Sequence, residues 1–280
     1  MNTLGSALRQ LQTGGLPRLE AQMLLLHALG QPPQARAWLL AHDDDALPAD
    51  AATRLHALAT RRLAGEPMAY LTGEKHFHGL RLQVDARVLD PRDDTETLVD
   101  WALALLPPDA PRRVLDLGTG SGAIALAIAH ARPRARVTAV DASADALAVA
   151  RANAGRLGLA VTLRHGDWLA PVAGEVFDLI VSNPPYIAEG DAHLPALAHE
   201  PRAALVSGAD GLDDLRRIVA TAPAHLAPGG WLLLEHGWDQ AAAVRALLTD
   251  AGFTQVQSRR DLAGIERCSG GCHCPSVERR

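Results

Sequence analysis

A tetrapeptide with two hydrogen-bond acceptors and a flat aromatic side chain, Asn183-Pro184-Pro185-Tyr186, directly follows the apolar run 177–182. The side-chain oxygen of Asn183 and the carbonyl oxygen of Pro184 are acceptors, the two prolines stiffen the backbone, and Tyr186 offers a planar face. Two fixed acceptors can orient the N–H groups of a planar NH₂ group and aim its lone pair at an electrophile. The pattern therefore indicates methyl transfer onto an amide or amine nitrogen.

A glycine-rich loop lies about two βα units before this tetrapeptide. It follows the apolar segment Val114–Leu117 and consists of Gly118, Thr119, Gly120, Ser121 and Gly122. Glycines permit a tight turn between strand and helix and bring backbone N–H groups against a ligand. Asn-Pro-Pro alone is also a common turn at the end of a strand, so the loop is what favours the catalytic interpretation.

The loop by itself leaves two cofactors open. Gly118-x-Gly120-x-x-Ala123 fits the dinucleotide fingerprint, and Asp141 lies about 20 residues further on, where a ribose-binding acid is expected. However, Asp116 places a carboxylate just before the glycines, where it suits a cationic amino group better than a pyrophosphate. S-adenosylmethionine carries such an amino group, so we expect this cofactor rather than a nicotinamide.

Two residues after a third strand complete the expected cofactor site. Asp167 offers a carboxylate for the adenine amine, and Trp168 offers an indole face for its ring. Ordinary packing is the alternative role of Trp168.

The spacing of apolar residues predicts the helices and strands that position these side chains. Apolar residues at helical spacing predict helices over 17–29, 35–41 and 49–63, hence a small helical bundle over residues 1–75. Alternating residues predict a β-hairpin over 76–90. A methyltransferase domain over 91–267 follows. Its alternating strands and helices predict an α/β fold, a Rossmann-like doubly wound sheet that is mainly parallel. The predicted strands cover 136–140, 160–164, 177–182, 231–235 and 254–258, and the predicted helices cover 143–157, 212–226 and 238–251.

Composition and charge limit the expected cellular location and the expected partners of the protein. The 280 residues are 48% hydrophobic with no apolar run of membrane-spanning length, and Met1–Gly5 lacks the features of a signal peptide. We therefore expect a cytoplasmic protein with no membrane partner. The net charge of -5 argues against a large nonspecific nucleic-acid surface.

Three cysteines fall close together near the C-terminus: Cys268, Cys272 and Cys274. Structural zinc sites usually have four ligands with Cys-x₂-Cys spacing, which is absent here. We therefore expect no metal site, and we expect residues 268–280 to form a flexible tail.

Several of these segments resemble those of a known family. Val114–Gly122, Asp141, Gly166–Trp168 and the tetrapeptide are similar to motifs of class I methyltransferases that act on nitrogen. Segments 65–73, 91–96, 199–201 and 261–264 narrow the resemblance to the HemK/PrmC-type peptide chain release factor glutamine methyltransferases. The resemblance covers residues 1 to 267, with Asp93 standing where family members usually carry proline.

The resemblance implies methylation of the glutamine side-chain amide in the Gly-Gly-Gln motif of bacterial class I release factors. By similarity, the loop 118–122, Asp141, Trp168 and Asn183 contact S-adenosylmethionine, and Asn183–Tyr186 hold the glutamine. The helical domain would recognise the release factor. Three further carboxylates are expected to be surface charges or helix caps: Asp94, Glu96 and Glu200.

Other substrates remain open for the same fold. A sister enzyme methylates a glutamine of a large-subunit ribosomal protein, and an adenine methyltransferase would hold the exocyclic amine of a flipped base with the same tetrapeptide. Asp94-Thr95-Glu96 favours the release-factor branch, and no basic recognition region supports the nucleic-acid reading.

Overall fold

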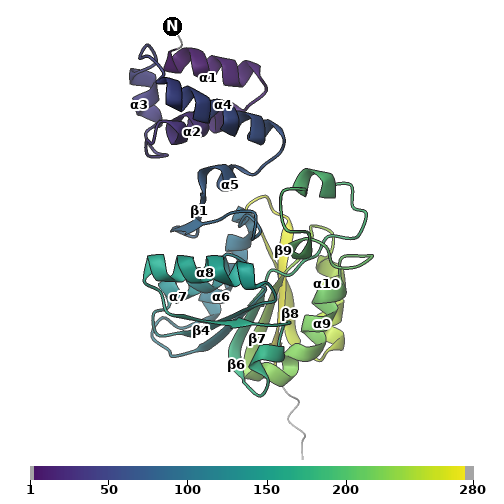
Figure 1. Ribbon diagram of the computed structural model, residues 1–280. Helices are drawn as coiled ribbons and strands as arrows, with labels where there is room; N and C mark the ends of the chain where they lie inside the picture. The colour runs from purple at the N-terminus through teal and green to yellow at the C-terminus, as the bar shows by residue number, and fades with distance from the viewer. Residues whose placement is uncertain (1–2, 275–280) are drawn as a thin grey trace, which may run out of the picture. The chain divides into compact units, whose positions relative to one another are not determined.

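The computed structural model describes residues 3–274 and divides into two compact units (Figure 1). One unit comprises Met1–Glu74 with Ala196–His199, and the other comprises Lys75–Pro195 with Glu200–Arg280.

The first unit is built from short helices, as predicted from the sequence. They are α1 Leu4–Thr13, α2 Arg18–Ala28, α3 Arg36–Ala41, α4 Ala49–Leu63 and α5 Met68–Thr72. Prolines directly precede α2, α4 and α5, where the fixed φ of proline suits a helix start and its missing N–H costs nothing. The core of this bundle contains fully buried leucines from two helices, Leu24, Leu25 and Leu26 of α2 and Leu39 of α3.

A two-stranded hairpin follows, formed by β1 Glu74–Phe77 and β2 Leu80–Gln83. His78 and Gly79 at its turn both have positive φ, +46° and +77°, which is the geometry of the tight hairpin turns that match strand twist. The presence of a hairpin is therefore confirmed, although it covers residues 74–83 rather than the predicted 76–90.

The second unit contains a seven-stranded sheet in the order β5-β4-β3-β6-β7-β9-β8. Its strands are β3 Arg113–Leu117, β4 Arg136–Asp141, β5 Val161–His165, β6 Phe177–Ser182, β7 Leu226–Glu235, β8 Thr254–Arg260 and β9 Glu266–His273. β3 to β7 pair in parallel, whereas β9 pairs antiparallel with both β7 and β8. The strand order runs outward from β3 through β4 to β5, and the chain then crosses back to β6 on the other side of β3. β3 and β6 therefore meet at the point where the strand order reverses.

Helices cover both faces of this sheet, which confirms the doubly wound fold. Figure 1 shows α6 Glu96–Leu105, α7 Ala123–Ala131 and α8 Ala144–Leu157 on one side, with α9 Asp213–Thr221 and α10 Ala241–Asp250 on the other. The helix predicted over 212–226 ends early as an α-helix and continues as a 3₁₀ turn over Ala222–His225, because Pro223 has no N–H to donate. Further 3₁₀ turns cover Asp93–Thr95, Ala170–Val172, Leu194–Leu197 and Arg202–Ala204.

The expected tail beginning at residue 268 is wrong for the residues that the structure describes. Residues 268–273 belong to β9, an interior strand, and Cys268 and Cys272 are buried. The sequence did not predict this strand, because two glycines interrupt the run of strand-forming residues. Each is required by close packing: a Cβ on Gly270 would lie 2.5 Å from the Leu233 side chain, and one on Gly271 would lie 2.8 Å from Phe253. Residues 275–280 lie outside the described residues.

The remaining cysteine, Cys274, is exposed, and its Sγ atom lies 2.9 Å from that of Cys272. Between residues 3 and 274, no group of three or more His, Cys, Asp or Glu side chains is arranged to hold a metal ion.

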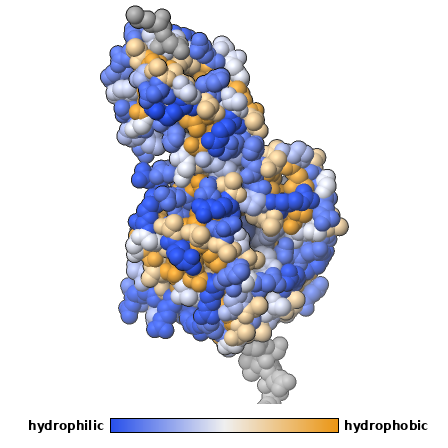
Figure 2. Space-filling view, viewed as in Figure 1, coloured by the Kyte–Doolittle hydropathy of each residue, from blue (hydrophilic) through white to orange (hydrophobic). Residues whose placement is uncertain are grey.

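Polar and charged side chains are interspersed with small apolar areas on the face seen in Figure 2. None of the helices within the described part of the chain is both long enough and apolar enough to cross a membrane.

Candidate active site

The glycine loop and the tetrapeptide leave neighbouring parallel strands at the same edge of the sheet. Leu117, the last residue of β3, is in register with Ser182, the last residue of β6. The Ser182 hydroxyl also donates a 2.7 Å hydrogen bond to the Leu117 carbonyl oxygen. Gly118 and Asn183, the next residues of each chain segment, therefore start side by side, at the edge where parallel sheets bind ligands.

The loop has the tight geometry that its glycines predict. Gly118, Gly120 and Gly122 have φ values of +70°, +55° and +85°, which side chains rarely adopt. The buried side chain of Asn153, on α8, donates a 3.0 Å hydrogen bond to the Ser121 carbonyl oxygen and so fixes the loop from the helix side. The backbone of the loop is thus held in place by groups of the protein itself.

Asp116 is fully buried beneath this loop. Its Oδ2 atom accepts hydrogen bonds from the Thr119 hydroxyl at 2.6 Å and the Ala125 amide at 3.2 Å. Its Oδ1 atom has no hydrogen-bond partner among residues 3–274. Burial raises the pKa of Asp116 to about 7, although the two hydrogen bonds oppose the rise. A buried carboxylate oxygen without a partner fits the cationic amino group that the sequence suggested.

Asp141 ends β4, the strand beside β3. Its carboxylate accepts 2.8 Å hydrogen bonds from the Gly120 and Ser143 amides, so it lies against the glycine loop. A carboxylate at this strand end is placed as a ribose-binding acid would be in such folds.

Trp168 and Asp167 differ in where their side chains lie. The Trp168 indole packs over the start of the loop, 3.4 Å from where a Cβ on Gly118 would be. Trp168 itself has a strained positive φ of +44°, which aims the ring there. In contrast, the Asp167 carboxylate is exposed and forms a 2.5 Å ion pair with Arg217 on α9. The structure therefore brings Trp168, but not the Asp167 side chain, to the loop.

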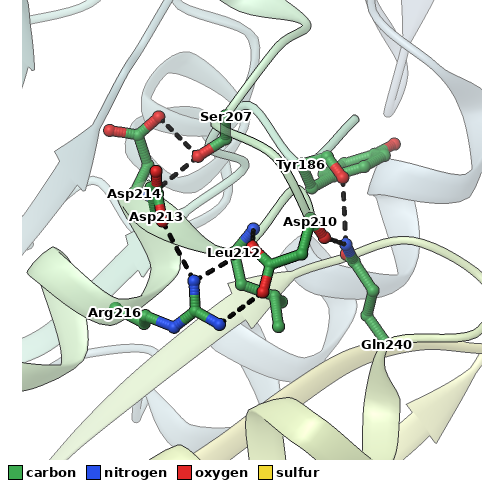
Figure 3. Close-up of polar contacts among 8 residues, drawn as sticks. All are labelled: Tyr186, Ser207, Asp210, Leu212, Asp213, Asp214, Arg216 and Gln240. Carbon is green, nitrogen blue, oxygen red and sulfur yellow. Dashed lines mark hydrogen bonds and ion pairs between the residues drawn. The ribbon is translucent and has the colours of Figure 1, made fainter. Parts of the chain in front are cut away.

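The tetrapeptide is held at both ends. The Asn183 Nδ2 atom donates to the Thr95 hydroxyl oxygen at 3.2 Å, which leaves its Oδ1 atom facing another way. The Tyr186 hydroxyl lies 3.4 Å from the Glu235 carboxylate at the end of β7, and burial raises the pKa of Tyr186. The Tyr186 carbonyl oxygen accepts a 3.0 Å hydrogen bond from the Gln240 side chain (Figure 3).

The segment that follows the tetrapeptide folds back on the same site. Figure 3 shows Ser207 hydrogen-bonded to Asp214 at the start of α9, with the hydroxyl donating to Oδ2 at 2.8 Å. The second oxygen of Asp214 accepts from the Trp168 indole N–H at 3.2 Å. Asp214 therefore links the indole on the cofactor side to the connection on the tetrapeptide side.

One of the three carboxylates that the sequence placed at the surface is buried. The Glu200 carboxylate pairs with Arg92 at 2.5 Å and accepts from the Asp90 amide at 3.1 Å. The other two are partly exposed: Asp94 lies 3.5 Å from Arg267, and Glu96 accepts a 2.6 Å hydrogen bond from the His78 amide. The interpretation of Glu200 as a surface charge or helix cap is therefore wrong.

Sequence reasoning missed Thr95, Glu235 and Gln240, all of which contact the tetrapeptide or its partners. Glu235 had a usable signal. It is a charged residue that ends an apolar strand at the ligand-binding edge, and a buried charge there calls for a function. For Thr95 the only signal was the family resemblance of segment 91–96, because its partner Asn183 lies 88 residues away in the chain.

Comparison with known proteins gives matches over nearly the whole chain. The family described as Methyltransferase small domain matches residues 95–256, and the family described as PrmC N-terminal domain matches residues 2–73. The release factor glutamine methyltransferase of Bordetella pertussis is 57% identical over 260 residues, covering 92% of this chain and 95% of that protein. The protein of the same name from Xylella fastidiosa (strain Temecula1) is 52% identical over 272 residues, covering 96% of this chain and 98% of that protein.

A crystal structure of a methyltransferase from Pyrococcus furiosus has a similar fold, with a TM-score of 0.53 and 20% identity. The likeness covers 70% of this chain and 90% of that one.

Proposed function

This chain belongs to the release factor glutamine methyltransferases, and from that membership we propose that it methylates the glutamine side-chain amide in the Gly-Gly-Gln motif of bacterial class I release factors. The methyl donor would be S-adenosylmethionine. The proposal rests on the pairing of β3 with β6. Because the two strands end side by side, the glycine loop after β3 and the tetrapeptide after β6 begin next to each other.

The residues around the glycine loop fit S-adenosylmethionine. When bound, this cofactor supplies an electrophilic methyl group on a sulfonium. The unpartnered oxygen of Asp116 suits its amino group, Asp141 suits the ribose hydroxyls, and the Trp168 ring suits the adenine. The loop itself, Gly118 to Gly122 with Thr119 and Ser121 between the glycines, would line the remaining side. Asp167 would contribute through its backbone, because its side chain is paired with Arg217.

The tetrapeptide would grip the acceptor amide. Asn183 Oδ1 and the Pro184 carbonyl oxygen would accept the two N–H hydrogens, Pro185 would keep the backbone stiff, and Tyr186 would pack against the flat amide. Held this way, the nitrogen lone pair points at the methyl group, so positioning supplies much of the rate. The nitrogen would gain the methyl group as the sulfur–methyl bond breaks and S-adenosylhomocysteine leaves, and it would then lose one proton. No strong base is needed, because the methylated nitrogen is acidic and can release that proton to water.

The expected setting follows from this substrate. Release factors would be the protein partners, recognised in part by the helical unit, and the enzyme would act in the cytoplasm without a stable nucleic-acid or membrane partner. The net charge of -5 supports this choice over a nucleic-acid substrate.

A labelling experiment tests the proposal. The purified chain is incubated with S-adenosylmethionine labelled in its methyl group, together with a release factor, large-subunit ribosomal proteins, DNA and tRNA in separate reactions. We expect label on the release factor alone. A matched release factor with asparagine in place of the motif glutamine should remain unlabelled. Label on a ribosomal protein or on nucleic-acid adenine, with none on the release factor, would overturn the proposal in favour of that substrate.

A further inference from the structure

A chain of polar side chains connects Glu235 to both ends of the tetrapeptide. The Glu235 carboxylate lies 3.4 Å from the Tyr186 hydroxyl, and the Thr95 side chain also faces that carboxylate. Thr95 in turn accepts from the Asn183 Nδ2 atom at 3.2 Å. Glu235 thus reaches Tyr186 directly and reaches Asn183 through one hydroxyl.

Burial makes this arrangement significant. Only 1% of the Glu235 surface is exposed, and in the part of the chain that the structure describes its Oε2 atom has no hydrogen-bond partner. A buried carboxylate of this kind is costly, and the sheet would be more stable with an uncharged side chain in its place. Since the fold does not require the charge, the charge needs another explanation.

The hydrogen bonds of Thr95 offer an explanation for the buried charge. The Thr95 hydroxyl has a single hydrogen to donate, so it can donate to only one neighbour. Thr95 occupies the position before α6, where a threonine usually caps the helix, yet its side chain makes no cap hydrogen bond. An ionised carboxylate only accepts, so Thr95 must give its hydrogen to Glu235. Thr95 can then only accept from Asn183, and this forces the amide NH₂ of Asn183 toward Thr95.

We propose that Glu235 is a positioning residue that, through Thr95, fixes the direction of the Asn183 amide and, together with Gln240, holds Tyr186. With its NH₂ group on Thr95, Asn183 presents its oxygen to the incoming amide, which is the acceptor that the reaction needs. Without the ionised carboxylate, Thr95 can donate to Asn183 instead, and the amide can turn its NH₂ group toward the substrate. Two NH₂ groups would then face each other without an acceptor.

The backbone of the tetrapeptide is held from the same connection. Gln240 lies five residues after Glu235, and its amide bridges two segments. Its Nε2 atom donates to the Tyr186 carbonyl oxygen at 3.0 Å (Figure 3). Its Oε1 atom accepts from the Gly237 amide at 2.8 Å. A Cβ on Gly211 would lie 2.3 Å from the same Tyr186 oxygen, so this carbonyl is enclosed on both sides. The β7–α10 connection thus fixes Tyr186 at its hydroxyl and at its carbonyl.

This inference rests on the proposed function, and it predicts a pH dependence. Burial raises the pKa of Glu235 to about 7, and the groups that face it are Thr95, Tyr186, Asp94, Arg267 and Cys268. Arg267 and the two hydrogen bonds favour the ionised form, whereas Asp94 opposes it. Turnover should therefore fall as the pH drops below about 7 and Glu235 takes up a proton.

The test compares Glu235→Gln with the parent enzyme on a release factor. We expect kcat to fall by about tenfold or more, the dissociation constant of S-adenosylmethionine to stay within about twofold, and the acidic limb of the pH profile to disappear. The thermal midpoint of the variant should be higher than that of the parent at pH 8, because the variant buries no charge.

A matched pair at Thr95 separates positioning from packing. Thr95→Val keeps the shape but loses the hydroxyl, and it should lower kcat by about tenfold. Thr95→Ser keeps the hydroxyl, and it should stay within a few-fold of the parent. The double variant Thr95→Val/Glu235→Gln should be little worse than either single variant, because both act on one hydrogen-bond chain.

The outcomes are distinguishable from failure of the proposed function. If the parent enzyme labels no release factor, the proposed function fails. If the parent is active while Glu235→Gln keeps its turnover and its acidic limb, the positioning role alone is wrong. Loss of activity in Glu235→Gln together with a lower thermal midpoint at pH 8 would also overturn it, since that result indicates a structural role.

Discussion

The hydroxyl of Ser182 donates a 2.7 Å hydrogen bond across the sheet to the backbone carbonyl of Leu117. Ser182 immediately precedes the tetrapeptide, and Leu117 immediately precedes the glycine loop. This one contact therefore ties the segment proposed to hold the methyl acceptor to the segment proposed to hold the donor. Both partners are fully buried, so their separation is fixed by packing as well as by the hydrogen bond.

Replacing Ser182 with alanine should disturb this alignment. The Leu117 carbonyl would lose a buried partner, which costs about 1–3 kcal/mol of stability, and kcat should fall several-fold because the two segments can shift. Ser143→Ala is a matched control. It removes the cap of α8, where the Ser143 hydroxyl accepts from the Ala146 amide, at a cost of about 1 kcal/mol. Its turnover should change little, and equal kcat losses in the two variants would argue against an alignment role.

Asn183→Ala should nearly abolish transfer. The variant loses the side-chain acceptor for the substrate amide, and removal of a positioning hydrogen bond from an active site costs roughly 10²-fold or more in turnover. Cofactor binding should be largely retained. Single-turnover kinetics and calorimetry provide the two measurements, and activity within a few-fold of the parent would exclude the proposed role.

Two strand-end aspartates should behave differently toward S-adenosylmethionine. Asp141→Ala removes a charged acceptor beside the glycine loop, and we expect binding to weaken by about 1.5–3 kcal/mol. Asp167→Ala removes only an exposed partner of Arg217, and we expect a near-parental dissociation constant. Calorimetry on both variants decides between the positions. The reverse order of effects would place the adenine amine, rather than the ribose, beside the more important carboxylate.

Binding of S-adenosylmethionine should release protons near neutral pH. Burial raises the pKa of Asp116 to about 7 in the free enzyme, and a cationic amino group beside its unpartnered oxygen would favour the ionised form and lower that pKa. Below pH 7 binding should therefore displace up to one proton, and affinity should increase as the pH rises toward 8. Calorimetry in buffers of different ionisation enthalpy measures the protons released. Asp116→Asn should bind more weakly and release none.

Glycine positions give a sharp test of the β9 assignment. Gly270→Ala would place a Cβ 2.5 Å from the Leu233 side chain and 2.6 Å from the Leu232 carbonyl, so we expect a loss of about 1–3 kcal/mol or more. Gly155→Ala, in the last turn of α8 with open space around it, should instead stabilise by about 0.5–1 kcal/mol. Urea unfolding of both variants measures the difference. Equal effects would contradict the interior position of β9.

Local patterns were sufficient to predict much of this fold. β3 and β6 are continuous apolar runs, and the glycine loop and the tetrapeptide carry their own turn chemistry, so strand, turn and ligand edge follow from short segments. The relation of the glycine loop to Asp116, Asp141 and Trp168 followed for the same reason, because each lies at or directly after the end of a strand.

The errors arose where long-range packing overrides local sequence. β9 has two glycines in place of a strand-forming pattern, and only the approach of Leu233 and Phe253 shows why. The sequence alone predicts that Glu200 is a surface residue. The structure shows that it pairs with Arg92, which lies 108 residues earlier in the chain. Partners at such separations leave no periodic signal in a single sequence.

The position of β9 also orders the assembly of the protein during synthesis. β8 leaves the ribosome before β9, yet among the described strands its neighbour in the sheet is β9. Until β9 is made, the edge of β7 stays open, and both β7 and β8 could pair with other nascent chains. Cys268 of β9 is in register with Glu235 of β7, so insertion of this strand also completes the burial of that carboxylate. A growing chain would therefore form its glycine loop early but acquire an oriented Asn183 only when the sheet closes.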